Sequence, residues 1–311
     1  MIAVSIRNAT LKLKNREVLS NIDIDLFEGE QLTVLGGLEA DLFLAMIAGV
    51  IPPSSGTIQI FGNDALKYRQ QQLSSLVSYL PPDPYIPPTL KLREYLELSC
   101  TVRRIKKAEQ KELVSSLLES LGLKKFSEYR LGQLSKSEKR MAALAAVLVT
   151  GSRLLLLTRP FENLSFDYRE LVAEHLRKTS KSGVTCILTS NTFDHLTKTD
   201  KVAIINNGRL VAQGILKDLV KIILDEQYLV LRVMDTKAVM EKLSKFPTIK
   251  KIGLSRDGVI KIWLKDFSND VSPTIELLFS LNLGVKQISI EQLNAVEACK
   301  QMYRKIIQEE T

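Results

Sequence analysis

The chain has 311 residues, of which 45% are hydrophobic, so it can form one large α/β domain and a smaller second one. No stretch reaches the 18 consecutive apolar residues of a membrane-spanning helix, and the first residues lack the apolar core of a secretory signal. Cys100, Cys186 and Cys299 are too isolated for a disulfide framework or a zinc site, and this isolation favours a reducing compartment. The net charge of +8 is compatible with a lysine-rich solvated face or with an anionic partner such as nucleic acid, lipid or an acidic protein.

The first elements lead into a strand, a glycine turn and a helix. Residues 4–13 and 22–27 alternate apolar and polar side chains, which predicts antiparallel strands joined by a polar turn at residues 14–17. Residues 32–35 then form a buried strand, Gly36 and Gly37 a turn, and residues 42–47 a buried helix. This order is typical of a phosphate-binding loop, whose backbone N–H groups surround phosphates.

The side chains that such a loop needs are missing. A phosphate loop ends in Gly-Lys-Ser/Thr, but here Ala40 stands at the lysine position and Asp41 at the hydroxyl position, and the loop is two residues short. Glu39 and Asp41 would face a polyanion, and each carboxylate–phosphate contact costs about 1 kcal/mol in water and about 4 kcal/mol at an effective dielectric constant near 20. The loop therefore predicts weak or no nucleotide binding.

Strands and helices alternate in the next part of the chain. Residues 57–61 and 76–80 are predicted strands, and the proline-rich stretch after them is extended. Helical spacing in residues 93–100, 107–121 and 135–149 predicts a helical insert from about 90 to 150. Further strands are expected at residues 154–157, 185–189 and 202–205, with a helix at 168–179. The alternation predicts a mostly parallel sheet with right-handed crossovers.

Residues 1 to about 217 resemble the ATP-binding cassette of ABC transporters. Besides the loop, the resemblance rests on segments in the family's order: SYLPPDPYIPPTLKLREYL for the glutamine loop, QLSKSEKRMAALAAVLV for the signature helix, RLLLLTRPFENLSFD for Walker B and the D-loop, ILTSNTFDH for the switch-histidine loop, and KVAIINNGRLVAQG for the closing strands. It implies an α/β fold with a mixed sheet, a core of the phosphate-loop type and a helical subdomain.

The resemblance also shows which functional positions have changed. Side chains that would contact adenine, metal, phosphate or water are replaced by Leu13 for the adenine-stacking aromatic, Pro82 for the glutamine, Thr158 for the metal-binding aspartate, Arg159 for the water-polarising glutamate, Ser165 for the D-loop aspartate and Asn191 for the switch histidine. A neutral hydroxyl cannot replace the aspartate that holds Mg²⁺, and a cation cannot polarise the attacking water as the glutamate does. His195, four residues beyond Asn191, is interpreted as a surface residue.

The signature LSGGQ has become Leu134, Ser135, Lys136, Ser137 and Glu138. Ser135 keeps a hydroxyl that can bond a γ-phosphate held by another subunit, and Lys136 adds charge there. Two interpretations of the new cations remain open. In the first, Arg159 forms a salt bridge with Glu162 and Lys136 with Glu138, and no ligand is bound. In the second, the two cations rebuild an anion site, because arginine suits phosphate geometrically, although the acidic residues Glu39 and Asp41 of the loop oppose an anion there.

The C-terminal part, from about residue 225, has a pattern of its own. Residues 228–233, 249–254, 259–264 and 285–290 are predicted strands, with helices at 236–246 and 274–281 and a turn at Arg256-Asp257-Gly258. This β-α-β-β-α-β order predicts a ferredoxin-like α+β domain. A last helix is expected at residues 295–307, and Trp263 is interpreted as a core residue. The domain is similar to the tail of drug- and sodium-efflux ABC subunits, where it supports dimerisation.

The resemblance implies a pseudo-ATPase subunit of an ABC transporter, with a cassette at 1–220 and an accessory dimerisation domain at 225–311. It would hold no cofactor of its own, pair with an active cassette that holds Mg-ATP, and contact a membrane-spanning subunit through about residues 80–100 on the cytoplasmic face of the membrane. Two alternatives remain: an ATPase with unorthodox ligands, and a regulatory module that binds nucleic acid or anionic lipid. Nucleic acid is disfavoured because the densest basic stretch, residues 103–107, has no interleaved aromatic residues.

Overall fold

The computed structural model of the chain describes residues 1–14, 16–67, 75–192, 199–216, 218–219, 227–234, 236–243, 246–255, 258–280 and 284–292. The chain divides into two compact units, Met1–Leu216 and Lys217–Thr311.

The first unit begins with an antiparallel sheet in the order β2-β1-β4-β5. It consists of β1 (Ile2–Leu13), β2 (Arg16–Phe27), β4 (Ser55–Ile60) and β5 (Asn63–Asp64). Buried and exposed residues alternate as expected in residues 22–27, but β1 departs from alternation at residues 7–11, where its pairing with β2 has register shifts. β2 starts at Arg16 and not at residue 22. Leu13 pairs directly with Arg16, so the predicted polar turn is shorter than the sequence suggested.

A second, mostly parallel sheet has the order β10-β9-β3-β8-β7-β6. Its strands are β3 (Gln31–Leu35), β6 (Val77–Leu80), β7 (Leu154–Leu157), β8 (Thr185–Ser190), β9 (Lys201–Asn206) and β10 (Arg209–Gly214). Only β10 runs antiparallel to its neighbour. All residues of β3, β7 and β8 are buried, which explains the uninterrupted apolar run in β7. The predicted parallel sheet is confirmed.

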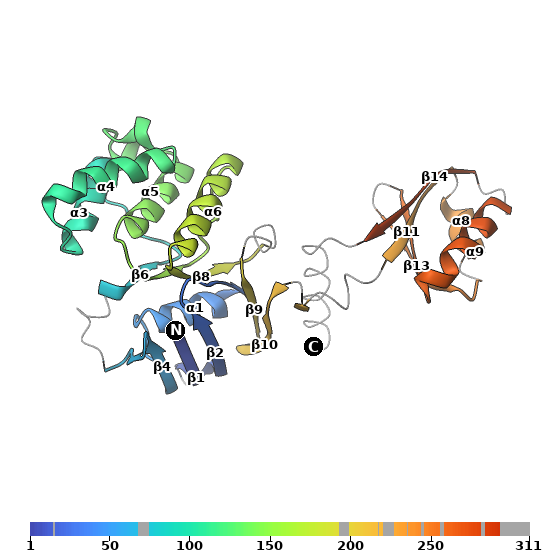
Figure 1. The fold of residues 1–311 in the computed structure, drawn as a ribbon, viewed down its shortest axis with the longest axis horizontal. Coiled ribbons are helices and arrows are strands. Elements are labelled where there is room, and N and C mark those ends of the chain that lie inside the picture. The colour runs from blue at the N-terminus through green and yellow to red at the C-terminus, as the bar shows by residue number, and fades with distance from the viewer. Residues whose placement is uncertain are drawn as a thin grey trace. The chain divides into compact units, whose positions relative to one another are not determined.

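Helices cover both faces of the parallel sheet (Figure 1). On one face, α1 (Leu38–Ile47) packs with the antiparallel sheet. On the other lie α3 (Leu92–Val102), α4 (Lys107–Ser120), α5 (Lys136–Leu148) and α6 (Phe166–Lys181). Two short 3-10 helices, Lys124–Phe126 and Leu131–Gln133, precede α5. Leu154 and Leu156 belong to the core that contains α1 and the antiparallel sheet. Leu155 and Leu157 belong to the core that contains α3, α4, α5 and α6. The predicted helical insert is present, and α1 begins four residues before the predicted helix.

The second unit is a four-stranded antiparallel sheet in the order β12-β13-β11-β14. Its elements are β11 (Gln227–Val233), α8 (Thr236–Leu243), β12 (Ile249–Leu254), β13 (Ile260–Leu264), α9 (Phe267–Ser280) and β14 (Val285–Gln292). This topology confirms the ferredoxin-like fold. The half-buried Trp263 stacks beside Tyr228, with ring centroids 5.2 Å apart. The predicted last helix and the Arg256-Asp257 part of the predicted turn lie outside the described residues.

Candidate functional site

The glycine turn follows β3 and leads directly into α1. Gly36 has to lack a side chain, because a Cβ there would lie 2.9 Å from the Ile205 carbonyl oxygen on β9. Gly37 caps α1 without a side-chain hydrogen bond, and the Glu39 carboxylate lies beside it, 3.4 Å from where a Gly37 Cβ would be. Ala40 is fully buried. The turn therefore joins a buried strand to a helix N-terminus, as a phosphate loop does, but presents no cation at the lysine position.

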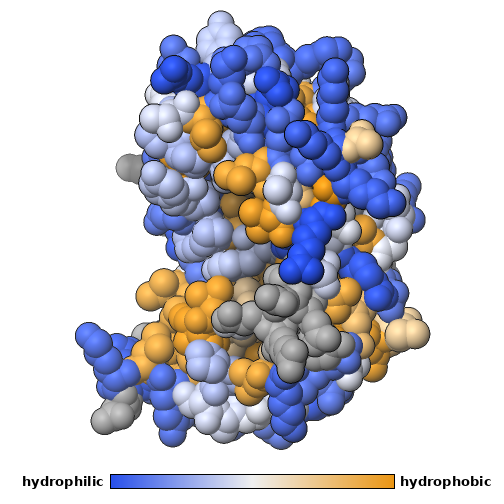
Figure 2. All heavy atoms as spheres, turned by 90° about the vertical axis from the view of Figure 1, so that its left-hand side faces the viewer, coloured by the Kyte–Doolittle hydropathy of each residue, from blue (hydrophilic) through white to orange (hydrophobic). Residues whose placement is uncertain are grey.

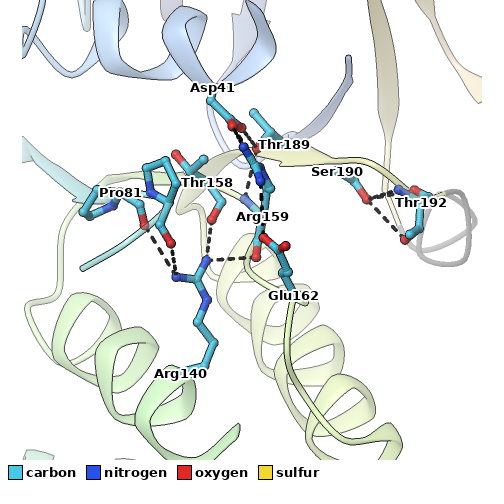
Figure 3. Close-up of polar contacts among 10 residues, drawn as sticks. Asp41, Pro81, Arg140, Thr158, Arg159, Glu162, Thr189, Ser190 and Thr192 are labelled. Atoms are coloured by element: carbon cyan, nitrogen blue, oxygen red, sulfur yellow. Dashed lines mark hydrogen bonds and ion pairs between the residues drawn. The ribbon is translucent and has the colours of Figure 1, made fainter. Parts of the chain in front are cut away.

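The Asp41 carboxylate is buried and already bonded (Figure 3). Only 4% of the residue is exposed. Its Oδ2 accepts hydrogen bonds from Nε of Arg159 at 2.8 Å and from Nη2 of the same residue, and its Oδ1 accepts one from Thr189 Oγ1 at 2.9 Å. The expectation that Asp41 faces an incoming anion is therefore wrong. Its charge is neutralised inside the protein, between α1, the end of β7 and β8.

Arg159 is held in place by its backbone as well as by its side chain. Its φ angle is +45°, in the left-handed region, and its N–H donates to Thr189 Oγ1 at 3.0 Å. Its guanidinium also pairs with Glu162 at 3.5 Å, as one of the two interpretations of the sequence predicted. The hydrogen bonds and charge of Asp41 raise the pKa of Arg159, against the effect of burial. No local pattern in the sequence signals this main partner, which lies 118 positions away.

These contacts suit an ion pair within the chain and not the coordination of a metal ion. A guanidinium has only donors, so it can neither coordinate a metal nor accept a proton from water. Arg159 contacts the carboxylate that stands at the hydroxyl position of the loop, and Thr158, at the metal-binding position, is fully buried. Among the described residues, no three His, Cys, Asp or Glu side chains come together as metal ligands would. The residues present therefore do not fit the metal.

A buried arginine that the sequence analysis missed lies next to this cluster. Arg140, on α5, donates to the carbonyl oxygens of Pro82 at 2.9 Å, Thr158 at 2.6 Å and Arg159 at 2.9 Å (Figure 3). It is 7% exposed, and its burial lowers its pKa. Arg140 ties the signature helix to the Pro81-Pro82 segment and to the end of β7. A charged residue at the start of an alanine-rich buried helix was the signal that could have revealed it.

The N-terminus of α5 carries the residues predicted to face another subunit. Ser135 caps the helix: its Oγ accepts the N–H of Glu138 at 3.3 Å, and its own N–H donates to the Glu138 carboxylate at 2.7 Å. Lys136 is exposed, and the described part of the chain shows no ion pair between it and Glu138. Ser137 Oγ accepts the N–H of Ser165 at 3.1 Å. Both hydroxyls act as acceptors, so each still has a proton to donate.

The remaining predicted positions differ in exposure and in surroundings. Leu13, at the end of β1, is 37% exposed, and Pro82 is half-buried. Asn191 follows β8 and lines a cavity of about 150 Å³ together with Arg159. His195 lies outside the described residues.

A groove of about 350 Å³ lies between β6, α3 and α5, and we call it the helical-lobe groove. It is lined by Ser78, Tyr79, Leu80, Pro81, Pro84, Tyr95, Leu98, Ser99, Val102, Arg103, Ala143, Ala146, Val147 and Thr150. Leu98 is 49% exposed and Val102 73% exposed. Figure 2 shows the side of the molecule on which α3 lies in Figure 1, and there hydrophobic residues gather in the middle with hydrophilic ones around them. The predicted contact segment, residues 80–100, supplies part of this groove. None of the described helices is long and apolar enough to cross a bilayer.

Comparisons with known proteins agree on one family. Residues 19–162 match the model of the family described as ABC transporter. The chain is 30% identical over 204 residues to a molybdate/tungstate import ATP-binding protein of Pyrococcus horikoshii, covering 64% of this chain and 59% of that protein. It is 27% identical over 223 residues to a spermidine/putrescine import ATP-binding protein of Mesoplasma florum, covering 70% and 62%. The chain thus spans about three fifths of the length of these relatives.

Solved structures agree in fold. A structure of the ATP-binding subunit of an ABC transporter superposes with a TM-score of 0.66 at 19% identity, covering 70% of this chain and 92% of that one. A dimeric ATP-binding cassette in a post-hydrolysis state, bound to ADP and Pi, has a TM-score of 0.63 at 18% identity, covering 68% and 98%.

Proposed function

We propose that the first unit of this chain, an ATP-binding cassette domain of the ABC transporter family, does not hydrolyse ATP. It acts as the non-catalytic member of a transporter's pair of cassettes. Its proposed place is the cytoplasmic face of a membrane, next to membrane-spanning subunits.

The observation that carries the proposal is the bond between Asp41 and Arg159. Hydrolysis needs a metal to neutralise the developing phosphate charge and a base or polar group to position water. Here a guanidinium lies against the carboxylate at the hydroxyl position, and the backbone of Arg159 is fixed by Thr189. Binding Mg-ATP would require breaking this pair, leaving a carboxylate that is 4% exposed without its cation.

The exposed end of α5 supports a role opposite a partner's nucleotide. Ser135 retains a hydroxyl proton and Lys136 an exposed charge, both suited to a phosphate held by an active cassette. Glu138 works in the opposite direction, because its carboxylate already bonds the Ser135 N–H. We therefore expect any composite site to hold Mg-ATP through the partner's residues, with only a weak contribution from this chain.

The helical-lobe groove supports docking on a membrane-spanning subunit. It presents exposed Leu98 and Val102 beside the segment that the sequence analysis assigned to this contact. The relatives reported above are named as import subunits, whereas the second unit was predicted to be of the efflux type.

Titration of the whole chain with Mg-ATP in a calorimeter tests the proposal. We expect no binding in the micromolar range. Thermal unfolding gives a second readout: a ligand at 100 times its dissociation constant would add about 2.7 kcal/mol of stability, and we expect Mg-ATP to add none. Micromolar binding would show that the Asp41–Arg159 pair does not exclude nucleotide, and ATP hydrolysis by the wild-type chain would refute the non-catalytic cassette. If the wild-type chain hydrolysed ATP and the Arg159→Ala variant did not, the alternative of an ATPase with unorthodox ligands would be correct.

A further inference from the structure

A cavity of about 880 Å³ lies beside α6, at the edge of the parallel sheet where β3 and β9 begin, and we call it the α6 pocket. Gln31 is the first residue of β3, and Asp200 directly precedes β9. Arg159 and Asp41 meet at the opposite edge, where β7 and β8 end. The pocket has the volume of a small-molecule site, roughly 300–1,000 Å³, and it is separate from the cluster around Asp41.

Gln31 provides a buried polar group at the inner end of the α6 pocket. The residue is 4% exposed. Leu32 and Val34 belong to the core that contains α1, so the alternation of side chains along a strand directs Gln31 to the other face of the sheet, which α6 covers. Its Nε2 is buried and has no hydrogen-bond partner among the residues that the structure describes. A buried N–H group of this kind calls for an acceptor, which a ligand in the pocket can supply.

Asp200 places a carboxylate next to this donor. Its Oδ2 accepts the backbone N–H of Gln31 at 2.8 Å, which fixes the carboxylate at the inner end of the pocket. Asp200 is exposed, and within the described ranges it forms no ion pair. The inner end therefore offers an N–H donor and a negatively charged acceptor side by side.

Two cations of α6, Arg177 and Lys181, line the pocket at the same end. The chain beside Gln31 touches this end of the helix, because a Cβ on Gly29 would lie 3.3 Å from the Ser180 carbonyl oxygen. Arg177 and Lys181 are exposed, and in the part of the chain that the structure describes neither forms an ion pair. Positive charge is therefore available near Gln31 Nε2.

The outer end of the α6 pocket is acidic. Asp167 and Glu170, on the first turns of α6, line it, and Glu170 precedes Arg177 by seven residues, about 10 Å along a helix. Leu171 and Ala173 lie between the two ends. Along its length the pocket therefore changes from mixed donors and a carboxylate, past a short apolar wall, to carboxylates alone.

Three classes of small ligand can be compared with this arrangement. A simple anion would meet the Asp200 carboxylate at the inner end. A diamine would pair with the carboxylates but leave Gln31 Nε2 without an acceptor, because ammonium groups only donate. A free amino acid carries a carboxylate for Gln31 and an ammonium for Asp200 on the same carbon atom, and a long cationic side chain can reach the acidic end.

We propose that the α6 pocket binds a free amino acid with a cationic side chain, such as arginine or lysine. Its carboxylate accepts a hydrogen bond from Gln31 Nε2, its α-ammonium donates to Asp200, and its side chain extends past Leu171 towards Asp167. This binding goes beyond the role of the cassette in a transporter and does not depend on whether the cassette hydrolyses ATP.

Calorimetric titration of the full chain with L-arginine tests the proposal, and two analogues each remove one contact. Agmatine is arginine without the carboxylate, and citrulline has a neutral group in place of the guanidinium. We expect arginine to bind with a dissociation constant below about 1 mM. Each analogue should bind at least about tenfold more weakly, equivalent to ~1.4 kcal/mol.

Two variants with matched controls assign the contacts. Gln31→Met removes the amide donor and should weaken arginine binding about tenfold while leaving agmatine unchanged, because agmatine has no carboxylate for Gln31. Asp167→Asn should weaken arginine and leave citrulline unchanged. The controls Gln213→Met, on β10, and Glu112→Gln, on α4, make the corresponding changes at exposed positions outside the pocket and should alter none of these affinities.

Absence of binding for both arginine and lysine would overturn the proposal and leave the pocket to water. Equal affinity for arginine and its two analogues would also overturn it, as would an equal loss in each variant and its control. Asp167 is exposed, so Asp167→Asn and its control decide the matter if circular dichroism shows that Gln31→Met does not fold. ATP hydrolysis by a chain that binds arginine in the expected pattern would refute the non-catalytic cassette alone.

Discussion

The cluster around Asp41 differs in how its charges are balanced from a second group of cations, Arg104, Lys106 and Lys107, which is exposed where α3 leads into α4 and which we call the basic rim. In the cluster, Arg159 bonds Asp41 and Glu162, so each charge has a partner within the chain. At the rim, Arg104, Lys106 and Lys107 are exposed and have no acidic partner among the described residues. Both regions are rich in arginine or lysine, but only one of them uses the charge internally.

This difference separates charges that support the fold from charges that do not. A buried ion pair whose removal leaves one charge unpaired matters for folding, because the remaining charge is far from water. Exposed cations add little to stability, since solvent already compensates them. We therefore expect substitutions in the cluster to lower the free energy of unfolding and substitutions at the rim to leave it nearly unchanged.

The largest effect is expected for Arg159→Ala. The Asp41 carboxylate would keep only Thr189 as a partner at a position that is 4% exposed, so the free energy of unfolding should fall by about 3–5 kcal/mol. Urea denaturation followed by circular dichroism measures it.

Asp41→Asn is the matched control, because it leaves Arg159 able to turn towards solvent and Glu162. It should cost about 1–2 kcal/mol, and the double variant should cost less than the sum of the two single ones. Strict additivity would mean that the two side chains do not stabilise each other.

A smaller loss is expected for Arg140→Met, which removes the link between α5 and the ends of β6 and β7. The carbonyls of Thr158 and Pro82 lose a charged donor, and the free energy of unfolding should fall by about 2–3 kcal/mol in the same denaturation experiment. Arg140→Lys, which keeps one donor group, should recover part of it. An unchanged midpoint for Arg140→Met would show that the cluster does not depend on this residue.

The pH dependence of the free energy of unfolding measures the contribution of a buried titratable group outside both regions, His175. Burial lowers the pKa of His175 on α6, so the unfolded chain binds a proton more readily than the folded one. This contribution is present above the ordinary value of 6.5 and is lost as the pH falls through the lowered folded pKa. We expect a modest loss of stability as the pH falls below 6.5, and a flatter profile for His175→Gln. An identical profile in the variant would assign the loss to other groups.

The smallest effect is expected at the rim. The triple variant Arg104→Ser, Lys106→Ser, Lys107→Ser should change the free energy of unfolding by less than about 0.5 kcal/mol, because its side chains are exposed. A loss of several kcal/mol would remove the distinction drawn above, since it would show that these cations also support the fold.

Much of the fold was predictable because apolar residues report burial through their spacing. The run Leu154–Leu157 predicts a strand covered on both sides, and the structure places its alternate residues in two different cores. Boundaries were less predictable. Arg16, which is exposed, belongs to β2 because it pairs with Leu13, a contact that its own polarity does not signal.

The sequence by itself determined the resemblance to the ABC transporter family, the order of the elements and the absence of a lysine and an aspartate at the positions of Ala40 and Thr158, since these depend on residue identity and local periodicity. Only the tertiary structure decided what Asp41 and Arg159 do. They stand 118 positions apart, and they meet because parallel strands end at the same edge of the sheet, beside the start of α1. A long-range ion pair has no periodic signal, so the carboxylate that the sequence predicts to face a phosphate is in the structure the partner of a guanidinium.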